Sequence, residues 1–176
     1  MIITISGPPG SGKSTIGRML AERLGWDYIS VGEIFRQMAT DRGMSLAEFS
    51  TLAERKHSID LDLDRRVVDA VQNSMVVEGR LAAHMLTRHR IPALKVWIDA
   101  DTEERAMRVA RREYASPEAV LGEIEARESS ERRRYKEIYG IDAQDTAIYD
   151  IVIDSTHLNP SEILKMIMEA MALEAS

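Results

Sequence analysis

The sequence predicts an α/β domain in which a five-stranded parallel sheet carries helices on both faces. Short, continuous apolar runs are typical of strands buried on both sides of a parallel sheet, and here such runs alternate with segments of helical spacing. Alternation of this kind builds right-handed βαβ units. The chain has 176 residues, of which 44% are hydrophobic and 30% charged, as expected for one globular domain with a full core.

The first half of the chain is expected to contain two strands and four helices. Residues 2–6 are a β-branched run that enters a glycine-rich turn, and the helix after that turn ends at Gly25. Ser45 and Glu48 have the spacing of a capping box, which opens a further helix. The expected strands are 2–6 and 27–30, and the expected helices are 14–24, 33–40, 45–55 and 59–72.

The second half is expected to add three strands and three helices. Compact apolar runs predict the strands, while N-cap residues predict the helix starts. Asp101 can cap the first of these helices, with Glu104 closing a capping box, and Gly140 suits the C-cap of the second. The expected strands are 75–77, 94–98 and 151–153, and the expected helices begin at Asp101, Ser116 and Asn159.

The composition argues against several classes of protein. Cysteine is absent, which excludes disulfides, thiolate zinc sites and a cysteine nucleophile, and the four histidines lack the close pairing of a zinc-helix motif. The net charge of -6 argues against a nucleic-acid binder. Met1 leads straight into a strand-like run, and no apolar stretch reaches the ~18 residues of a membrane span. We therefore expect a cytoplasmic monomer that binds neither nucleic acid nor a membrane.

The glycine-rich turn between the first strand and the first helix fits the P-loop pattern G-x-x-x-x-G-K-[ST]. Backbone N–H groups can converge on a phosphate only where side chains do not block them, and the helix N-terminus adds partial positive charge. We expect Lys13 to reach the β and γ phosphates of a nucleoside triphosphate and Ser14 to hold Mg²⁺. The predicted ATP-binding residues are Gly7, Pro8, Pro9, Gly10, Ser11, Gly12, Lys13, Ser14 and Thr15.

Among P-loop proteins, a small kinase fits the rest of the chain best. A GTPase would need a base-reading Asn-Lys-x-Asp segment, which the sequence lacks, and a motor or transporter is normally longer. Small kinases use arginines to screen charge on the transferred phosphoryl group. On the helix that starts at Asp101, four arginines fall within an arc of about 120°. They are Arg105, Arg108, Arg111 and Arg112.

The helix after Ser116 has the pattern of a lid. Residues 125–134 are polar on all sides, so this section has no apolar face for a core and is expected to project into solvent or over a cleft. Arg127, Glu131 and Arg134 share one face of it. A solvated, salt-bridged helix is the alternative, but beside a P-loop the lid is the favoured interpretation.

Together these motifs resemble the nucleoside monophosphate kinase family, and most closely its archaeal-type cytidylate kinases. The likeness spans nearly the whole chain, and the segment 134–142 is its most subgroup-specific part. The other segments that carry it are 2–15, 30–36, 76–80, 127–139 and 149–153. The resemblance implies one P-loop NTPase-fold domain over 1–176, with a core at 1–32, 74–112 and 146–176, an acceptor-binding excursion at about 33–73 and a lid at about 113–145.

The resemblance also implies roles for individual residues. Arg36 would hold the acceptor phosphate, above a strand end shaped by Ser30 and Gly32. Glu78 stands where the family often has an aspartate that positions the metal through water, and Leu81 stands where bacterial-type enzymes have an acidic residue, so base recognition differs. The implied catalytic residues are Lys13, Arg127 and Arg134, the acceptor-binding residues are Ser30, Gly32, Arg36, Gly79, Arg80 and Glu131, and the metal-binding residues are Ser14 and Glu78.

A phosphate acceptor also suits the chemistry. A nucleoside monophosphate has a second phosphate pKa of about 6, so it is an anionic nucleophile at neutral pH and needs no general base. The expected reaction is in-line transfer of the γ-phosphoryl group from MgATP to CMP or dCMP, with lid closure excluding water. The residues leave open an adenylate kinase or other small-metabolite kinase, and a nucleotide-gated P-loop assembly factor.

Overall fold

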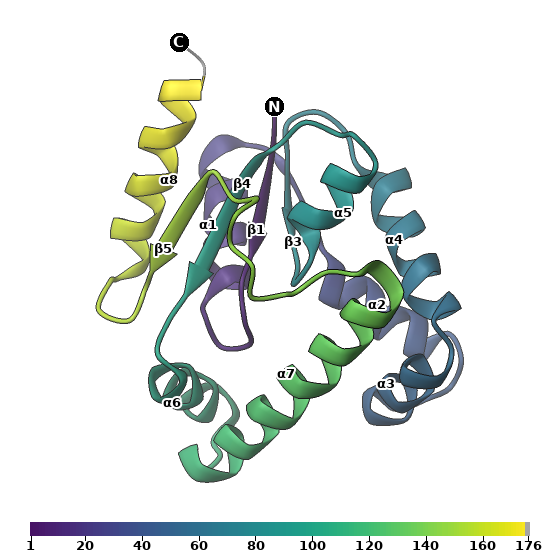
Figure 1. Ribbon diagram of the computed structural model, residues 1–176. Coiled ribbons are helices and arrows are strands. Elements are labelled where there is room, and N and C mark those ends of the chain that lie inside the picture. Colours follow the sequence, from purple (N-terminus) through teal and green to yellow (C-terminus); the bar gives the residue numbers. More distant parts are fainter. Residues whose placement is uncertain (175–176) are drawn as a thin grey trace.

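The computed structural model describes residues 1–174 and shows the predicted five-stranded parallel sheet (Figure 1). The strand order is β2-β3-β1-β4-β5, and every neighbouring pair is parallel. Because the first strand lies in the middle of the sheet, the loop after it opens at the point where the chain turns from one half of the sheet to the other. The strands are β1 (Ile2–Ser6), β2 (Asp27–Ser30), β3 (Met75–Glu78), β4 (Leu94–Asp99) and β5 (Ile151–Asp154).

Seven of the eight helices in the described residues were predicted, and α5 was missed. This helix has only seven residues and no side-chain cap, so no local signal marks it. Helix α2 begins earlier than predicted because Ser30 is its N-cap, with the Ser30 hydroxyl accepting from the Glu33 amide at 3.3 Å. The helices are α1 (Lys13–Leu24), α2 (Val31–Thr40), α3 (Leu46–Arg55), α4 (Ser58–Ala70), α5 (Ala82–Arg88), α6 (Thr102–Glu113), α7 (Pro117–Tyr139) and α8 (Pro160–Glu174).

Most of the predicted helix caps are present, and one is wrong. Ser45 and Glu48 form the complete capping box, and Gly140 ends α7 in the left-handed conformation with φ 70°. Asp101 occupies the N-cap position of α6, but its side chain makes no cap hydrogen bond. The predicted box does not form because the carboxylate of Glu104 instead accepts from Arg108 at 2.8 Å.

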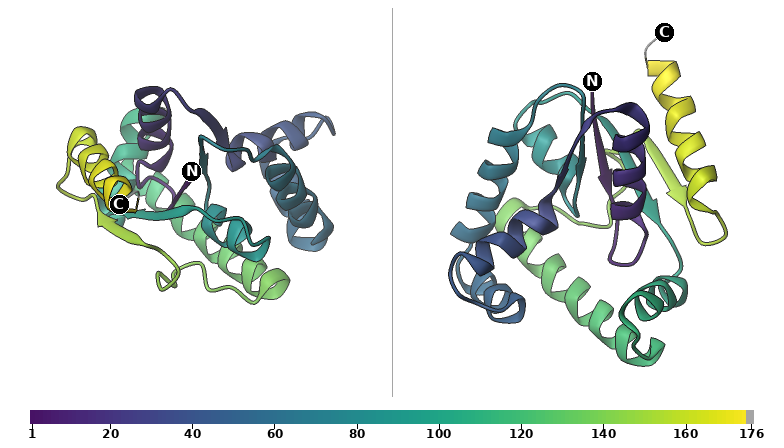
Figure 2. Two further views of the ribbon diagram at one scale, coloured as in Figure 1. Left: turned by 90° about the horizontal axis from the view of Figure 1, so that it is seen from above. Right: turned by 180° about the vertical axis from the view of Figure 1, so that it is seen from behind.

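Two hydrophobic clusters cover the two faces of the sheet, because neighbouring residues on a strand point to opposite sides. Ile3 and Val76 pack with α1 and α8, whereas Ile2, Met75 and Val77 belong to the cluster that includes α5. Figure 2 shows these helices on either side of the strands. The sheet is therefore buried on both faces, as its apolar strands predict.

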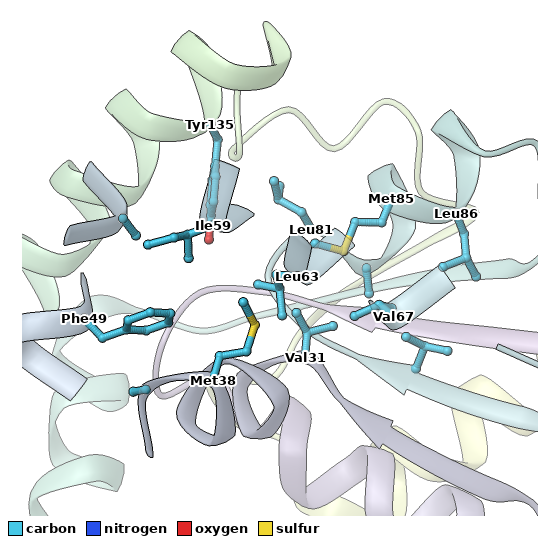
Figure 3. Close-up of a cluster of buried hydrophobic side chains, with 14 of the residues drawn as sticks. Val31, Met38, Phe49, Ile59, Leu63, Val67, Leu81, Met85, Leu86 and Tyr135 are labelled. Carbon is cyan, nitrogen blue, oxygen red and sulfur yellow. The ribbon is translucent and has the colours of Figure 1, made fainter. Parts of the chain in front are cut away.

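The hydrophobic cluster that includes α5 continues beyond the sheet into the segment formed by α2, α3 and α4 (Figure 3). Met38, Phe49 and Val67 are fully buried there, and the ring centroids of Phe35 and Phe49 lie 4.8 Å apart. Tyr135 joins this cluster from α7, so the long helix is anchored to it. Figure 1 shows α7 running below the carboxyl ends of the strands, between α6 and the α2–α4 segment. Within the described residues, no helix is long and apolar enough to span a membrane.

Candidate active site

The P-loop follows β1 and can be built only with glycine at two of its positions. Gly7 has φ 154°, and a Cβ there would lie 2.0 Å from the carbonyl oxygen of Ile98. Gly10 has φ 79°, and a Cβ there would lie 2.7 Å from the carbonyl oxygen of Arg105. Side chains are strongly disfavoured at both places, so the backbone stays open along the loop. No side chain caps the start of α1, which leaves its first N–H groups available for an anion.

Lys13 lies in the P-loop, and its pKa is shifted from the ordinary value for a lysine. Its Nζ donates to the carbonyl oxygen of Pro8 at 3.3 Å and lies 3.8 Å from a carboxylate oxygen of Glu78. Burial lowers the pKa of Lys13 to about 8, although Glu78 opposes this shift. The Lys13 ammonium group is thus held where a phosphate would favour its charged form.

Glu78 is the last residue of β3, which lies next to β1, and its side chain faces the P-loop. It is buried, and its carboxylate accepts from Ser30 Oγ at 2.9 Å and from Tyr28 Oη at 3.2 Å. The register explains this, because Glu78 lies beside Ser30 of β2 and Ile5 of β1. The carboxylate is therefore fixed at the carboxyl edge of the sheet, where the P-loop begins.

Mg²⁺ fits this donor set. Among the described residues, no group of three or more acidic or histidine side chains could hold a metal ion. Mg²⁺ does not need such a group, because it is usually bound by one or two protein oxygens together with substrate phosphates and water. Ser14 and Glu78 line the same cavity and supply oxygens of this kind.

Two cavities meet beside Lys13. The P-loop cavity has a volume of about 240 Å³ and is lined by Lys13, Ser14, Ser30 and Glu78, with arginines opposite them. The α2–α7 cavity has a volume of about 540 Å³ and extends between the α2–α4 segment, α5 and α7. The residues that line both cavities are Gly32, Arg36, Arg80 and Arg127. Three cations therefore stand at the junction of the two cavities.

The polar section of α7 is held over these cavities by ion pairs. Glu131 is buried between Arg80, whose Nε lies 2.6 Å from it, and Arg127, whose Nε lies 2.8 Å from it. Burial alone would raise the pKa of Glu131, but Arg80 and Arg127 outweigh it and hold the pKa below its usual range. At Glu131 and Arg134 this face of the helix is thus buried by charge pairing rather than by apolar packing, which the solvated-helix alternative did not anticipate, while Arg127 stays exposed.

Further contacts tie α7 to the α2–α4 segment. Arg134 is buried, and its Nε lies 3.1 Å from a carboxylate oxygen of Asp60 on α4. The hydroxyl of Ser130 donates to the carboxylate of Glu54 on α3. Helix α7 therefore bridges the P-loop side and the α2–α4 side of the molecule.

The arginines of α6 do not act as one group. Arg105 is buried and donates to the carbonyl oxygens of Pro9 and Ala100, each at 3.0 Å, while Arg108 donates to the carbonyl oxygen of Ser155 at 2.6 Å. Arg108 also donates to the carbonyl oxygen of Ser11 at 3.4 Å, so both side chains fasten the P-loop backbone to its surroundings. Arg112 lines the P-loop cavity instead. The shared helical arc predicted from the sequence therefore does not correspond to one shared contact.

The predicted site residues do not all line the two cavities. Most of them line one or both cavities, including Pro9, Gly10 and Gly79. Gly7, Ser11 and Gly12 shape the loop backbone, Pro8 lines a smaller cavity of about 130 Å³, and Thr15 is exposed on α1. Arg134 lines only the α2–α7 cavity. The functional roles of these residues remain predictions.

Sequence reasoning missed Asp60, Tyr135 and Glu128. Glu128 pairs with Arg105 at 2.7 Å, and Tyr135 lines the α2–α7 cavity. A signal for Asp60 was present, because Asp60 and Leu63 lie three residues apart on α4 and so share its buried face. An acidic residue on the apolar face of a helix indicates a partner or a ligand.

Residues 2–157 match the cytidylate kinase-like family. The chain belongs to this family. The cytidylate kinase of Halobacterium salinarum is 44% identical over 97% of this chain and 88% of its own length. That of Methanocaldococcus jannaschii is 45% identical over 97% of both chains. Membership confirms the resemblance that the motifs predicted.

The fold has broader relatives among solved structures. Shikimate kinase from Acinetobacter baumannii, in complex with shikimate, matches 98% of this chain and 93% of its own with a TM-score of 0.60 and 15% identity. At that identity the likeness concerns the fold alone, since one fold supports many chemistries. It confirms the predicted P-loop NTPase fold.

Proposed function

We propose that the chain transfers the γ-phosphoryl group of MgATP to CMP or dCMP, giving ADP and CDP or dCDP. The observation that carries this proposal is the meeting of two cavities at Arg36, Arg80 and Arg127, beside Lys13. One cavity contains the P-loop, and the other is large enough for a nucleotide. The relatives named cytidylate kinase support the choice of acceptor.

The donor half is assigned to the P-loop cavity. The backbone N–H groups of the loop and of the first turn of α1 bind the triphosphate, and Lys13 contacts its β and γ phosphates. Ser14 and Glu78 would hold Mg²⁺, Glu78 through water, and the bound ion would supply charge neutralisation at the phosphates. Arg105 keeps the loop in shape through its hydrogen bond to Pro9.

The acceptor half is assigned to the α2–α7 cavity. Arg36 binds the acceptor phosphate at the junction, where Ser30, Gly32 and Gly79 leave room for it. The acceptor is already ionised at neutral pH, so its phosphate oxygen attacks without a general base. The carboxylate of Glu33 pairs with Arg18 outside both cavities, which argues against hydroxyl activation at this strand end.

Positioning and charge screening account for the catalysis. Arg80 and Arg127 exchange their pairing with Glu131 for the phosphates, and Glu131 is then free to accept from the acceptor ribose. The lid, residues 113–145, and the excursion, residues 33–73, approach the core at 1–32, 74–112 and 146–176 as both nucleotides bind. This approach excludes water that would otherwise hydrolyse ATP.

The proposed enzyme works as a monomer in the cytoplasm, without nucleic acid or a membrane. The net charge of -6 disfavours binding to a polyanion. Sedimentation at micromolar concentration tests the oligomeric state, because a dimer would sediment measurably faster.

An acceptor panel tests the proposed reaction. Purified protein with MgATP is given CMP, dCMP, UMP, AMP or shikimate, and ADP release is measured, with Lys13→Ala as the inactive control. Turnover should be highest with CMP or dCMP and should fall by orders of magnitude in the control. Equal turnover with UMP and AMP would contradict the cytidylate assignment. ATP hydrolysis that no acceptor stimulates would favour a nucleotide-gated binding protein.

A further inference from the structure

Apart from Glu131, which pairs with Arg80 and Arg127, the described part of the α2–α7 cavity contains one buried carboxylate and one buried guanidinium that lie away from the P-loop. Asp60 is 3% exposed and Arg134 is 8% exposed, and both line this cavity but not the P-loop cavity. The surrounding wall includes apolar and aromatic side chains, among them Phe35, Leu81 and Tyr135. If Arg36 binds the acceptor phosphate at the junction, this far end receives the base.

The two charged groups have hydrogen-bonding capacity left over. Asp60 Oδ2 lies 3.1 Å from Arg134 Nε, yet neither atom has a well-formed hydrogen bond within the described residues. Burial raises the pKa of Asp60 even though Arg134 opposes the shift, so the carboxylate is short of stabilising donors. A guanidinium carries five N–H donors, and a carboxylate accepts at two oxygens. Buried groups in this condition call for a further partner, either water or a ligand.

We propose that Asp60 and Arg134 recognise the cytosine base of the acceptor and reject uracil. This inference rests on the proposed function of the site. Cytosine carries an amino group at position 4 next to an unprotonated ring nitrogen, N3, so its edge presents a donor beside an acceptor. Asp60 accepts from the amino group, and Arg134 donates to N3 or to the adjacent carbonyl oxygen.

Uracil inverts both positions. It has a carbonyl oxygen at position 4, which would face the carboxylate of Asp60, and an N3–H group, which would face the guanidinium of Arg134. Two acceptors and two donors would then be opposed inside an apolar wall, where unpaired polar groups are most unfavourable. Adenine has the same donor–acceptor edge as cytosine, so rejection of AMP depends on the size of the cavity.

The pair also explains how a chain with leucine rather than an acidic residue at position 81 can recognise cytosine. Leu81 is buried in the hydrophobic cluster and leaves that side of the cavity apolar. The carboxylate comes instead from α4, and its partner comes from α7. In this assignment Arg134 binds the acceptor base, and Lys13 and Arg127 contact the transferred phosphoryl group.

Asp60→Asn tests this inference, and Asp64→Asn is its matched control. The amide that replaces the Asp60 carboxylate keeps the size of the side chain but can donate to the position-4 oxygen of uracil. Asp64 lies one turn along the same helix and is equally buried, but it pairs with His89 at 3.1 Å and does not line the cavity. Steady-state kcat/KM is measured with CMP and with UMP at saturating MgATP.

The ratio of kcat/KM for CMP to that for UMP should fall about 100-fold in Asp60→Asn, with kcat/KM for UMP rising in absolute terms. Asp64→Asn should keep the wild-type ratio, and the KM for ATP should be unchanged in both variants. An equal loss with CMP and UMP in Asp60→Asn would show that the pair is only structural and would overturn the inference.

A measurement on the wild-type protein covers the case in which Asp60→Asn does not fold. An analogue of CMP that lacks the 4-amino group should be phosphorylated about 100-fold less efficiently than CMP, since Asp60 is left without its donor. Equal efficiency would refute recognition at this position. If the wild-type protein prefers CMP but Asp60→Asn keeps the wild-type ratio, only this inference fails. If the wild-type protein phosphorylates neither CMP nor dCMP, the proposed function fails with it.

Discussion

ATP binding should weaken steeply at alkaline pH because Lys13 loses its charge there. Burial lowers the pKa of Lys13 from 10.5 to about 8 in the free protein, with Arg80 and Arg127 adding to the effect and Glu78 opposing it. A bound triphosphate favours the charged amine and raises its pKa again. The complex therefore holds more protons than the free protein above pH 8, and the affinity falls as the pH rises.

The size of the effect follows from the two pKa values. With a pKa of about 8, the ratio of neutral to charged Lys13 rises from about 0.3 at about pH 7.5 to about 30 at about pH 9.5. The apparent affinity for ATP should then fall about 25-fold, or about 2 kcal/mol, over this range. A lysine with the ordinary pKa of 10.5 would give a change of only about 1.1-fold.

Isothermal titration calorimetry over this pH range measures the affinity directly, and buffers of different ionisation enthalpy report the protons taken up on binding. Tyr28 does not interfere, because burial raises its pKa to about 12. Lys13→Arg is the control, since arginine stays charged throughout and should bind ATP with little pH dependence. An equally flat profile for the wild-type protein would refute the buried-lysine argument.

Three further variants test other parts of the site. Arg36→Ala should raise the KM for CMP at least tenfold and leave ATP binding unchanged; equal weakening of both nucleotides would contradict its placement. Arg105→Met should lower the free energy of unfolding by about 3 kcal/mol and weaken ATP binding, because the Pro9 and Ala100 carbonyls lose their donor. Urea denaturation measures this loss, and an unchanged midpoint would argue against it. Phe49→Ala should lower the free energy of unfolding by about 3–5 kcal/mol, since this side chain is 0% exposed; a loss below about 1 kcal/mol would indicate that the α2–α4 segment repacks.

Local patterns in the sequence predicted much of the fold. The P-loop could be identified because its constraints act within a few residues: Gly7 and Gly10 have backbone angles that side chains disfavour, and Lys13 follows at a set spacing. The strands were found because burial on both faces leaves a continuous apolar run. Helix α5 and the Asp101 cap show where this fails, since a short helix has weak signals and the glutamate that should close a capping box can pair with another residue.

The polar contacts of the site were decided by the tertiary structure. Arg105 and Pro9 are 96 residues apart in sequence, yet one donates to the other, and Asp60 meets Arg134 only because α7 lies across the α2–α4 segment. No local pattern specifies such a pair, because its geometry depends on the strand order and on where α7 packs against the rest of the fold. Local sequence patterns were enough to reveal a phosphate-binding loop and the helices and strands around it. Which charges share a cavity depends on the fold, because burial and charge pairing between distant segments exist only once the chain has folded.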